Sequence, residues 1–169
     1  LSDALEVYGT LRDIEDLRYV GFKDVGAPFE QLQALTDAIH ADGRTSMLEV
    51  VSESAADEIR SIEAARRLGV QWVLGGTHPD EALPILAGSG ARYCPFPGTV
   101  IGHPSLLRGT VDSICESARG LTARDGVHGL DLLAYRFDGD VPELVRAVVS
   151  SCTSPVIAAG SVDSYERIL

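Results

Sequence analysis

The sequence has only one lysine, Lys23, beside thirteen arginines in its 169 residues. It also has only three cysteines, Cys94, Cys115 and Cys152, which lie far apart and form no CxxC pair. Disulfide bonds and a structural zinc site are therefore not expected, and the low cysteine count fits a reducing cytoplasm. We expect the three cysteines to act as small buried hydrophobic residues.

Long apolar runs and an excess of basic residues are missing as well. No run approaches the ~20 apolar residues that a membrane span needs, and no signal-peptide pattern is visible. The net charge is −11, from 14 basic and 25 acidic residues. Because so acidic a surface repels phosphate backbones, nucleic acid is not expected as a partner. The lack of a long apolar run means that a membrane is not expected as a partner either. An anionic ligand would need a local positive pocket.

Apolar runs typical of strands alternate with helical patterns along the chain. Strands are expected at 19–25, 45–51, 70–75, 92–97, 127–135 and 155–160. Helices are expected within 2–17 and at 28–42, 54–68, 78–87, 106–125 and 140–151. Capping residues mark helix starts at Ser54, Thr77 and Asp140, and glycines mark helix ends at Gly69 and Gly126. This alternation is typical of a parallel sheet covered by helices.

The two ends of the chain suggest which parallel fold this is. The sequence starts on a helical pattern and ends, at 164–169, on the opening turn of another helix. Six strands plus one lost at each end make the eight of a (β/α)8 TIM barrel, typically about 250 residues. We therefore expect one barrel domain over 1–169 that lacks its first and last strands. The competing fold is a doubly wound open sheet, but no GxGxxG follows the first strand.

The alternation of side chains along the strands places charges on the face away from the helices. In three of the expected strands, this rule leaves Lys23, Glu49 and Asp131 inside the barrel. A charge there is costly unless it is paired or functional. A lysine can form a Schiff base or polarise a carbonyl, and a neighbouring carboxylate can move a proton. Alternatively, the excess of arginine over lysine reflects codon composition, and Lys23 has no function. A further alternative is that Lys23 forms only a buried ion pair with Glu49.

A glycine pair and a histidine follow the strand expected at 70–75. Gly75 and Gly76 permit close approach of a ligand, and His78 stands at the start of the next helix. We expect a neutral imidazole there that hydrogen-bonds a ligand carbonyl, which makes His78 the fourth candidate catalytic residue. The alternative is an exposed first-turn histidine beside an ordinary cap.

The longest expected loop, 95–105, holds three prolines and two glycines. Stiff segments between glycine hinges suit a lid that excludes water. Such a lid would bring His103 and Arg108 to the ligand. The alternative is a surface loop that proline makes rigid.

The end of the sequence carries a phosphate-binding pattern. A strand ends in Gly160 and Ser161, and a helix is expected to start at Ser164. Glycine lets the backbone approach an anion, which free N–H groups and the helix dipole then bind. Tyr135, inside the barrel by the same alternation, is a further candidate ligand contact. The alternative is a tight strand-to-helix turn with Ser164 as its cap.

The residues Val156-Ile157-Ala158-Ala159-Gly160-Ser161-Val162, followed by Ser164-Tyr165-Glu166-Arg167-Ile168, resemble a known motif. It is the strand-seven phosphate motif of the ribulose-phosphate-binding barrels. That group includes sugar isomerases of histidine and tryptophan synthesis, hexulose-phosphate synthases, amino-sugar-phosphate epimerases and glycerol-operon antiterminators. The resemblance spans most of the chain in layout, but it is specific only over about the last fifteen residues.

Two departures from this group narrow what the resemblance implies. The strand at 92–97 lacks the acid that the histidine-pathway isomerases carry on strand five. Lys23-Asp24 also does not match the Asp-x-Lys-x-x-Asp signature of the decarboxylase branch. The resemblance therefore implies a phosphorylated ligand and leaves the reaction open.

These patterns together favour an enzyme that acts on a small phosphorylated sugar or keto metabolite. The reaction classes that fit are isomerase, epimerase and aldolase-type lyase, with no cofactor. No metal is expected, because the candidate ligands Glu49, His78, His103 and Asp131 show no tight HxH, HxxxH or DxD spacing among themselves. One alternative is a non-catalytic regulatory barrel that binds a phosphorylated metabolite. Another is a half-barrel that forms a homo-oligomer, because its first and last strands would be exposed edges.

Overall fold

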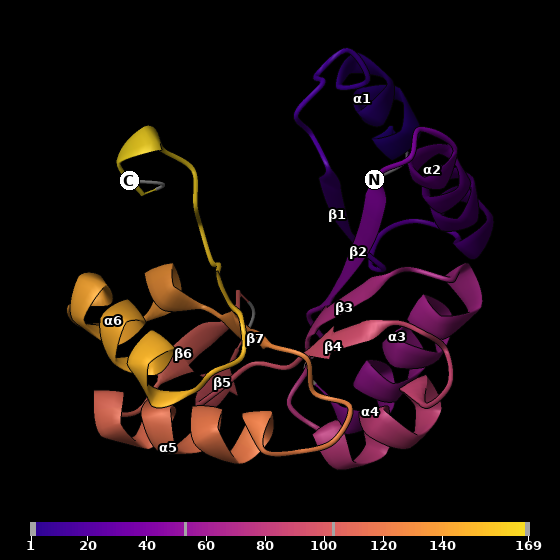
Figure 1. The fold of residues 1–169 in the computed structure, drawn as a ribbon. Helices are drawn as coiled ribbons and strands as arrows, with labels where there is room; N and C mark the ends of the chain where they lie inside the picture. The colour runs from indigo at the N-terminus through magenta and orange to yellow at the C-terminus, as the bar shows by residue number, and fades with distance from the viewer. Residues whose placement is uncertain (1–2, 53, 103, 168–169) are drawn as a thin grey trace. The chain divides into compact units, whose positions relative to one another are not determined.

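The computed structural model describes residues 3–52, 54–102 and 104–167. They form an α/β chain that divides into two compact units (Figure 1). The first unit comprises residues 1–74 and 78–92, and the second comprises 75–77 and 93–169.

The first part of the chain alternates strands and helices, as expected. Its elements are α1 (Ala4–Thr10), β1 (Tyr19–Lys23), α2 (Phe29–Ala41), β2 (Thr45–Val50), α3 (Ala55–Leu68), β3 (Trp72–Gly75) and α4 (Pro79–Leu86). The sheet order is β1-β2-β3-β4, where β4 (Arg92–Cys94) lies at the sequence boundary between the units. β1 and β2 are parallel, and Lys23 is paired in register with Glu49.

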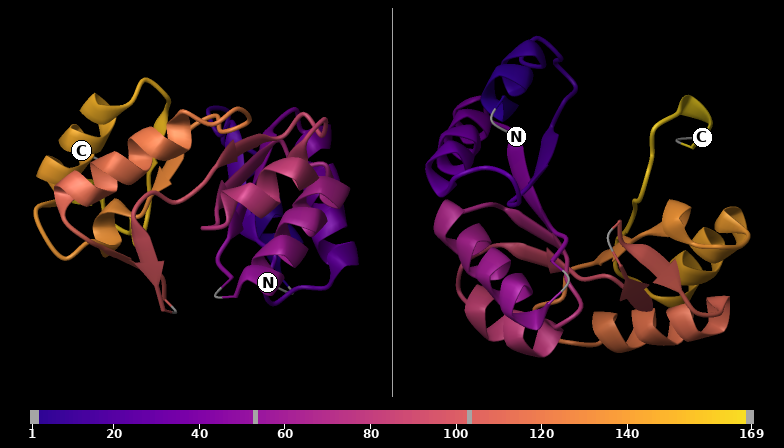
Figure 2. Two further views of the ribbon diagram at one scale, coloured as in Figure 1. Left: turned by 90° about the horizontal axis from the view of Figure 1, so that it is seen from below. Right: turned by 180° about the vertical axis from the view of Figure 1, so that it is seen from behind.

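The helices of the first unit cover one face of its strands (Figure 2). The buried side chains alternate along β2, where Ser46, Leu48 and Val50 face the helices. On β1, Phe22 is buried while Gly21 and Lys23 are exposed. These patterns confirm that Lys23 and Glu49 lie on the face away from the helices. Buried apolar residues fill the space between sheet and helices: Leu32, Leu35, Ile39, Ile62, Ala65, Leu68, Val73, Ala82 and Leu86.

The first helix is shorter than the helical spacing over 2–17 predicts. α1 ends at Thr10, and the chain then turns. The guanidinium of Arg44 donates hydrogen bonds to the carbonyls of Leu11, Arg12 and Ile14 at 3.3, 2.7 and 3.1 Å. Arg44 and the turn N–H groups of Ile14 and Leu17 together satisfy carbonyls that a longer helix would have bonded four residues on.

α3 begins and ends where the sequence predicts. The Ser54 hydroxyl accepts a hydrogen bond from the Asp57 N–H, and Gly69 closes the helix with a left-handed φ of 70°. α4, in contrast, begins at Pro79, so Thr77 is not its cap as expected. Proline suits the first helical position but keeps the residue before it out of the helical region. His78 therefore becomes the N-cap residue, with φ −117° and ψ 65°.

The second part of the chain has shorter strands than expected. Its elements are β5 (Thr99–Ile101), β6 (Leu106–Arg108), α5 (Val111–Thr122), β7 (Leu130–Leu132), the 3-10 turn η1 (Ala134–Arg136), α6 (Val141–Ser151), β8 (Val156–Ala158) and the 3-10 turn η2 (Tyr165–Arg167). β7 and β8 pair in parallel, and β5 pairs antiparallel with β6. Tyr135 lies in η1, so the expected strand 127–135 ends before it.

The lid predicted at 95–105 is a β-hairpin in the structure. Thr99 pairs with Arg108 and Ile101 with Leu106. The helix expected over 106–125 consequently starts only at Val111 and ends before Gly126, with Ala123 as its C-cap. Thr110 and Ser113 form a capping box at its start, and two orphan N–H groups are satisfied there.

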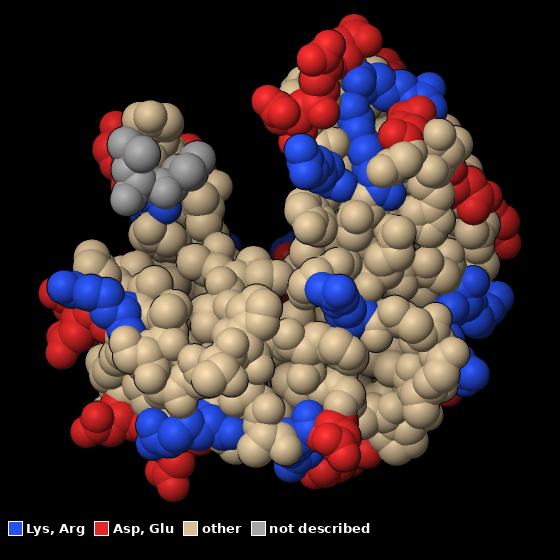
Figure 3. Space-filling model, viewed as in Figure 1, with Lys and Arg blue, Asp and Glu red and all other residues tan. Residues whose placement is uncertain are grey.

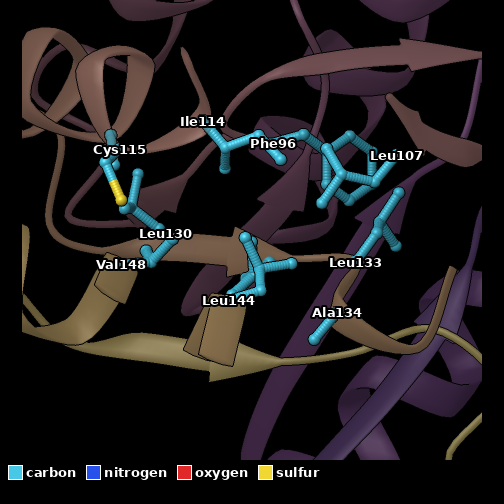
Figure 4. Close-up of a cluster of buried hydrophobic side chains, with 11 residues drawn as sticks. Phe96, Leu107, Ile114, Cys115, Leu130, Leu133, Ala134, Leu144 and Val148 are labelled. Atoms are coloured by element: carbon cyan, nitrogen blue, oxygen red, sulfur yellow. The ribbon is translucent and has the colours of Figure 1, made fainter. Parts of the chain in front are cut away.

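A cluster of buried apolar side chains forms the core of the second unit (Figure 4). α5 and α6 pack beside one another, and their buried residues meet those of β7. Ile114, Leu130 and Leu144 are completely buried, and each such side chain contributes about 1.5–3 kcal/mol by burial. All three cysteines are free, as expected; Cys94 and Cys115 are buried and Cys152 is half-buried. α6 begins after Asp140, whose carboxylate accepts from the Glu143 N–H as predicted.

Candidate functional site

An amine and a carboxylate meet at the strand ends of the first unit. Lys23 is the last residue of β1, and its Nζ lies 3.5 Å from Oε2 of Glu49 near the end of β2. Their pairing in register brings the two side chains together on one face. The side chain of Lys23 is 48% exposed and that of Glu49 28%, so the amine is less enclosed than the sequence predicts. An ion pair this exposed adds little stability.

Helix α3 holds the loop that follows β1. The Ser61 hydroxyl donates to Oδ2 of Asp24, the residue after Lys23, and lies 3.1 Å from the Ser52 hydroxyl. The other carboxylate oxygen, Asp24 Oδ1, is buried without a hydrogen-bond partner in the described part of the chain. Ser61 therefore connects the chain after β1 with the chain after β2. No local pattern predicts this contact, because it joins side chains that are 37 positions apart.

The same helix holds His78 through a carboxylate that the sequence analysis overlooked. The Glu58 carboxylate accepts from the His78 backbone N–H at 2.8 Å, and its second oxygen lies 2.8 Å from Nδ1 of the ring. Glu58 is 1% exposed, whereas the His78 side chain is 37% exposed. A pattern could have revealed Glu58, because it shares the inward stripe of α3 with Ile62 and Ala65.

The predicted phosphate turn lies in the second unit, directly after β8. Gly160 has φ 87° and Ser161 has φ 56°. Ser161 is the one described residue other than glycine with a positive φ. Such a backbone turns successive N–H groups toward one side, which is how anion-binding concavities form. The expected helix at Ser164 is only the short 3-10 turn η2 in the described residues. Among the described residues, the predicted phosphate turn therefore offers an anion backbone N–H groups without the dipole of a helix.

Arg136 packs against this turn, which the sequence analysis did not foresee. A Cβ at position 160 would lie 2.6 Å from Cγ of Arg136, so only glycine fits there. The Nε of Arg136 is buried and has no hydrogen-bond partner among the residues that the structure describes. A buried guanidinium nitrogen without an acceptor is unfavourable. Arg136 therefore adds a cation to the neighbourhood of the predicted phosphate turn.

Tyr135 contacts Arg167, which in turn contacts residues of the predicted phosphate turn. The Tyr135 hydroxyl donates to the Arg167 carbonyl at 2.6 Å, and the Arg167 guanidinium lies 5.5 Å from the centre of the Tyr135 ring. The Arg167 guanidinium also donates to the carbonyl of Ser161 and to Asp163. Tyr135 thus supports the turn through Arg167. Its expected contact with the ligand stays a prediction.

The remaining candidates occupy separate places. Asp131 is buried on β7, 1% exposed, and its N–H donates to the Pro95 carbonyl at 3.1 Å. Gly75 and Gly76 both have positive φ, 79° and 80°, which supports the need for glycine at these positions. Arg108 lies on β6, where its guanidinium is 3.9 Å from the carboxylate of Asp138. His103 lies outside the described residues.

The structure brings only some of the predicted residues together. Lys23 meets Glu49, and Gly160 adjoins Ser161. His78 pairs with Glu58, a residue the sequence analysis had not named. Over residues 3–52, 54–102 and 104–167, no group of three or more His, Cys, Asp or Glu side chains could hold a metal ion. None of the helices described is both long and apolar enough to cross a membrane.

Comparison with known proteins gives a likeness of fold. No family model and no curated protein matches the sequence. A glycerol uptake operon antiterminator regulatory protein from Listeria monocytogenes is similar in structure, with a TM-score of 0.64 and 15% identity over 97% of this chain and 80% of that one. A structure described as native KDPGal has a TM-score of 0.62 and 18% identity over 95% of this chain and 68% of that one.

A third similar structure is the tetrameric deoxyribose phosphate aldolase from Aeropyrum pernix. Its TM-score is 0.56 at 13% identity, over 98% of this chain and 85% of that one. All three neighbours are TIM-barrel-type proteins, so this chain has a TIM-barrel-type α/β fold. The resemblance to the phosphate-binding barrels is thereby confirmed as a likeness of fold, and a glycerol-operon antiterminator is among the neighbours, as the sequence implied.

Proposed function

We propose that the protein is an enzyme that acts on a small phosphorylated sugar or keto metabolite. The proposed reaction is that of an isomerase, an epimerase or an aldolase-type lyase. The observation that carries the proposal is the half-exposed pair of Lys23 and Glu49, 3.5 Å apart at the ends of two neighbouring parallel strands. In barrel enzymes the reacting groups lie at the strand ends. An ion pair this exposed adds little to the stability of the fold, so stability does not account for the pair.

The chemistry of this pair suits a carbonyl substrate. The ammonium of Lys23 passes one proton to Glu49, and the neutral amine then adds to the carbonyl carbon. The carbonyl oxygen leaves as water with the returned proton and one further proton from the nitrogen, and an iminium remains. The positive nitrogen draws electrons from the neighbouring carbon, so a C–H or C–C bond there breaks more easily. Without covalent capture, the ammonium would polarise the carbonyl by its charge.

We further infer that the second unit binds phosphate at the turn after β8. Gly160 and Ser161 would offer backbone N–H groups, and Arg136 would add a cation beside them. Arginine suits phosphate because its planar fork of donors matches two oxygens.

We further propose that the protein works in the cytoplasm, since its three cysteines are free. We also propose that it forms a homo-oligomer, which its elution volume in size-exclusion chromatography would test.

The decisive experiment is reduction with borohydride in the presence of phosphorylated keto compounds, dihydroxyacetone phosphate first. The sequence has one lysine, so a mass increase on the peptide that contains Lys23 identifies the amine without ambiguity. Lys23→Arg keeps the charge but cannot form the adduct, and Glu49→Gln should slow its formation. Loss of product formation in Lys23→Ala supports the proposal, and retention of most activity would remove Lys23 from the mechanism.

The competing proposal is a regulatory barrel that binds a phosphorylated metabolite without converting it. The fold likeness to an antiterminator regulatory protein favours this possibility. Calorimetry and long incubation distinguish the two proposals. Tight binding of a phosphorylated compound with no adduct and no product would establish the regulatory function instead of the enzymatic one.

A further inference from the structure

The contact between Glu58 and His78 gives one carboxylate two different partners on the same residue. One oxygen accepts the backbone N–H of His78, and the other lies against ring nitrogen Nδ1, both at 2.8 Å. Glu58 is 1% exposed, but the ring of His78 opens to solvent with 37% of its side chain exposed. The pair therefore links the interior of the first unit to its surface.

The stability of the fold does not by itself explain why Glu58, a carboxylate, occupies a buried position on α3. Glu58 shares its face of α3 with Ile62 and Ala65, both completely buried. A buried charge needs good partners to offset its desolvation, and an apolar residue of similar size is often as stable or more so. Glu58 has partners, and two of them, the backbone N–H and the ring nitrogen Nδ1, belong to His78, which follows β3 in the chain.

The hydrogen-bond directions determine where the proton of the ring lies. A backbone N–H only donates, and an ionised carboxylate only accepts. Nδ1 must therefore carry a proton in order to bond to Glu58. In a neutral imidazole the other nitrogen, Nε2, is then a proton acceptor, because only one ring nitrogen carries hydrogen.

We propose that Glu58 is a positioning residue that fixes the proton of His78 on Nδ1 and so makes Nε2 the proton acceptor for a bound keto compound. This inference rests on the proposed function and changes the role of His78. A neutral ring that hydrogen-bonds a ligand carbonyl, as the sequence analysis expected, would need its proton on Nε2. With Glu58 in place, the ring takes a proton and does not donate one.

The proposed step is proton abstraction beside a carbonyl. Nε2 takes the proton from the carbon next to the carbonyl, and the C–H electron pair forms a carbon–carbon double bond. The π electrons of the carbonyl move to its oxygen. Where Lys23 has already formed the iminium, the π electrons of the C=N bond move to its nitrogen instead. His78 becomes an imidazolium whose charge faces the Glu58 carboxylate, and it returns the proton in the reverse step.

Nitrogen NMR of the histidine rings tests the tautomer directly. The chain has four histidines. The ring-nitrogen signals that disappear in the His78→Gln variant are those of His78. In the wild-type protein we expect the His78 ring to carry a proton on Nδ1. Glu58→Gln should move that proton to Nε2, because the new amide oxygen must accept the backbone N–H while its NH₂ group donates to Nδ1.

Glu63→Gln is the matched control. Glu63 is exposed on the same helix, so this variant removes one charge and should leave the tautomer unchanged. A wild-type His78 with its proton on Nε2 would overturn the proposal, and that measurement needs no variant to fold. An unchanged tautomer in Glu58→Gln would overturn it as well.

Deuterium exchange gives the functional readout. Dihydroxyacetone phosphate in D₂O should exchange a carbon-bound proton in the presence of the protein. We expect the rate to fall about 100-fold or more in Glu58→Gln and His78→Gln, while the borohydride adduct on Lys23 still forms. Exchange at the wild-type rate in Glu58→Gln would overturn the inference. A wild-type protein that forms no adduct and exchanges no proton would overturn the proposed function instead, and the tautomer measurement would then decide the role of Glu58.

Discussion

Lys23 Nζ lies 3.5 Å from Glu49 Oε2 because the parallel register of β1 and β2 sets these two residues opposite each other. Both side chains keep contact with solvent, at 48% and 28% exposure. Solvent screens the attraction between such charges, so the pair contributes about 0–1 kcal/mol to stability.

The first prediction separates catalysis from folding at this pair. Lys23→Ala should change the free energy of unfolding in urea by less than about 1 kcal/mol while it abolishes the borohydride adduct. The reason is that the pair is exposed and packs little apolar surface. A loss of several kcal/mol in Lys23→Ala would show that the pair is structural.

The second prediction concerns the glycine at the phosphate turn. Gly160→Ala should destabilise the protein by more than Gly43→Ala does. Both positions have positive φ, 87° and 72°, but a Cβ meets Arg136 at position 160 and open space at position 43. The strain of a left-handed alanine alone is about 1–2 kcal/mol, and the contact with Arg136 adds to it.

A double-mutant cycle measures that added contact. Arg136→Ala removes Cγ of the arginine, so Gly160→Ala should be less harmful in that background. Urea unfolding of the four proteins gives the interaction energy. Equal effects of Gly160→Ala with and without Arg136 would contradict the close approach of the two residues.

The third prediction assigns anion binding to Arg136. Arg136→Met should weaken the binding of inorganic phosphate about tenfold or more, because a hydrogen bond to a charged group is worth about 1.5–3 kcal/mol. The measurement is a phosphate titration that follows the backbone amide NMR signals of Gly160 and Ser161.

Arg146→Met is the control for this titration. Arg146 lies exposed on α6 and donates only to the Pro142 carbonyl in the described part of the chain. The Arg146→Met variant removes one positive charge from the same unit, as Arg136→Met does, and should leave phosphate binding nearly unchanged. Equal losses in both variants would mean that net charge, and not Arg136, governs the affinity.

The fourth prediction concerns acid stability. The Asp42 carboxylate accepts from the Tyr8 hydroxyl at 2.7 Å and from the Arg12 guanidinium at 2.7 and 3.1 Å. Basic and acidic side chains lie next to one another over α1 and α2 (Figure 3). The hydrogen bonds from Arg12, and then from Tyr8, lower the pKa of Asp42 below its ordinary value.

The lowered pKa determines the sign of the effect. Stabilisation by Asp42 is complete above the pKa of the unfolded chain, about 4, and is lost as the pH falls through the lower folded value. Asp42→Asn should therefore reduce stability at neutral pH and flatten its decline in acid. Urea unfolding between pH 2.5 and 6 checks this, with the exposed Asp37→Asn as control. An acid decline of the same slope in Asp42→Asn would contradict the prediction.

Local patterns predicted the elements well where neighbours in sequence decide the structure. Ser54 and Gly69 bound α3 as expected, since caps act within a few residues. Prediction failed where a competing contact came from a distance. Arg44 binds the carbonyls after α1, and strand pairing takes residues 106–108 away from the expected helix. Pro79 shifted the start of α4 by a local rule that the sequence analysis did not apply.

The sequence by itself determined the alternation of strands and helices, the TIM-barrel-type fold and the face on which Lys23 and Glu49 lie. It could do so because the period of side chains along a strand and the caps of a helix depend on near neighbours. Only the tertiary structure decided that Glu58 bonds His78, that Ser61 holds Asp24 and that Arg136 packs on Gly160. These contacts join residues at least 20 positions apart, and no local period specifies which distant side chains the packing brings together.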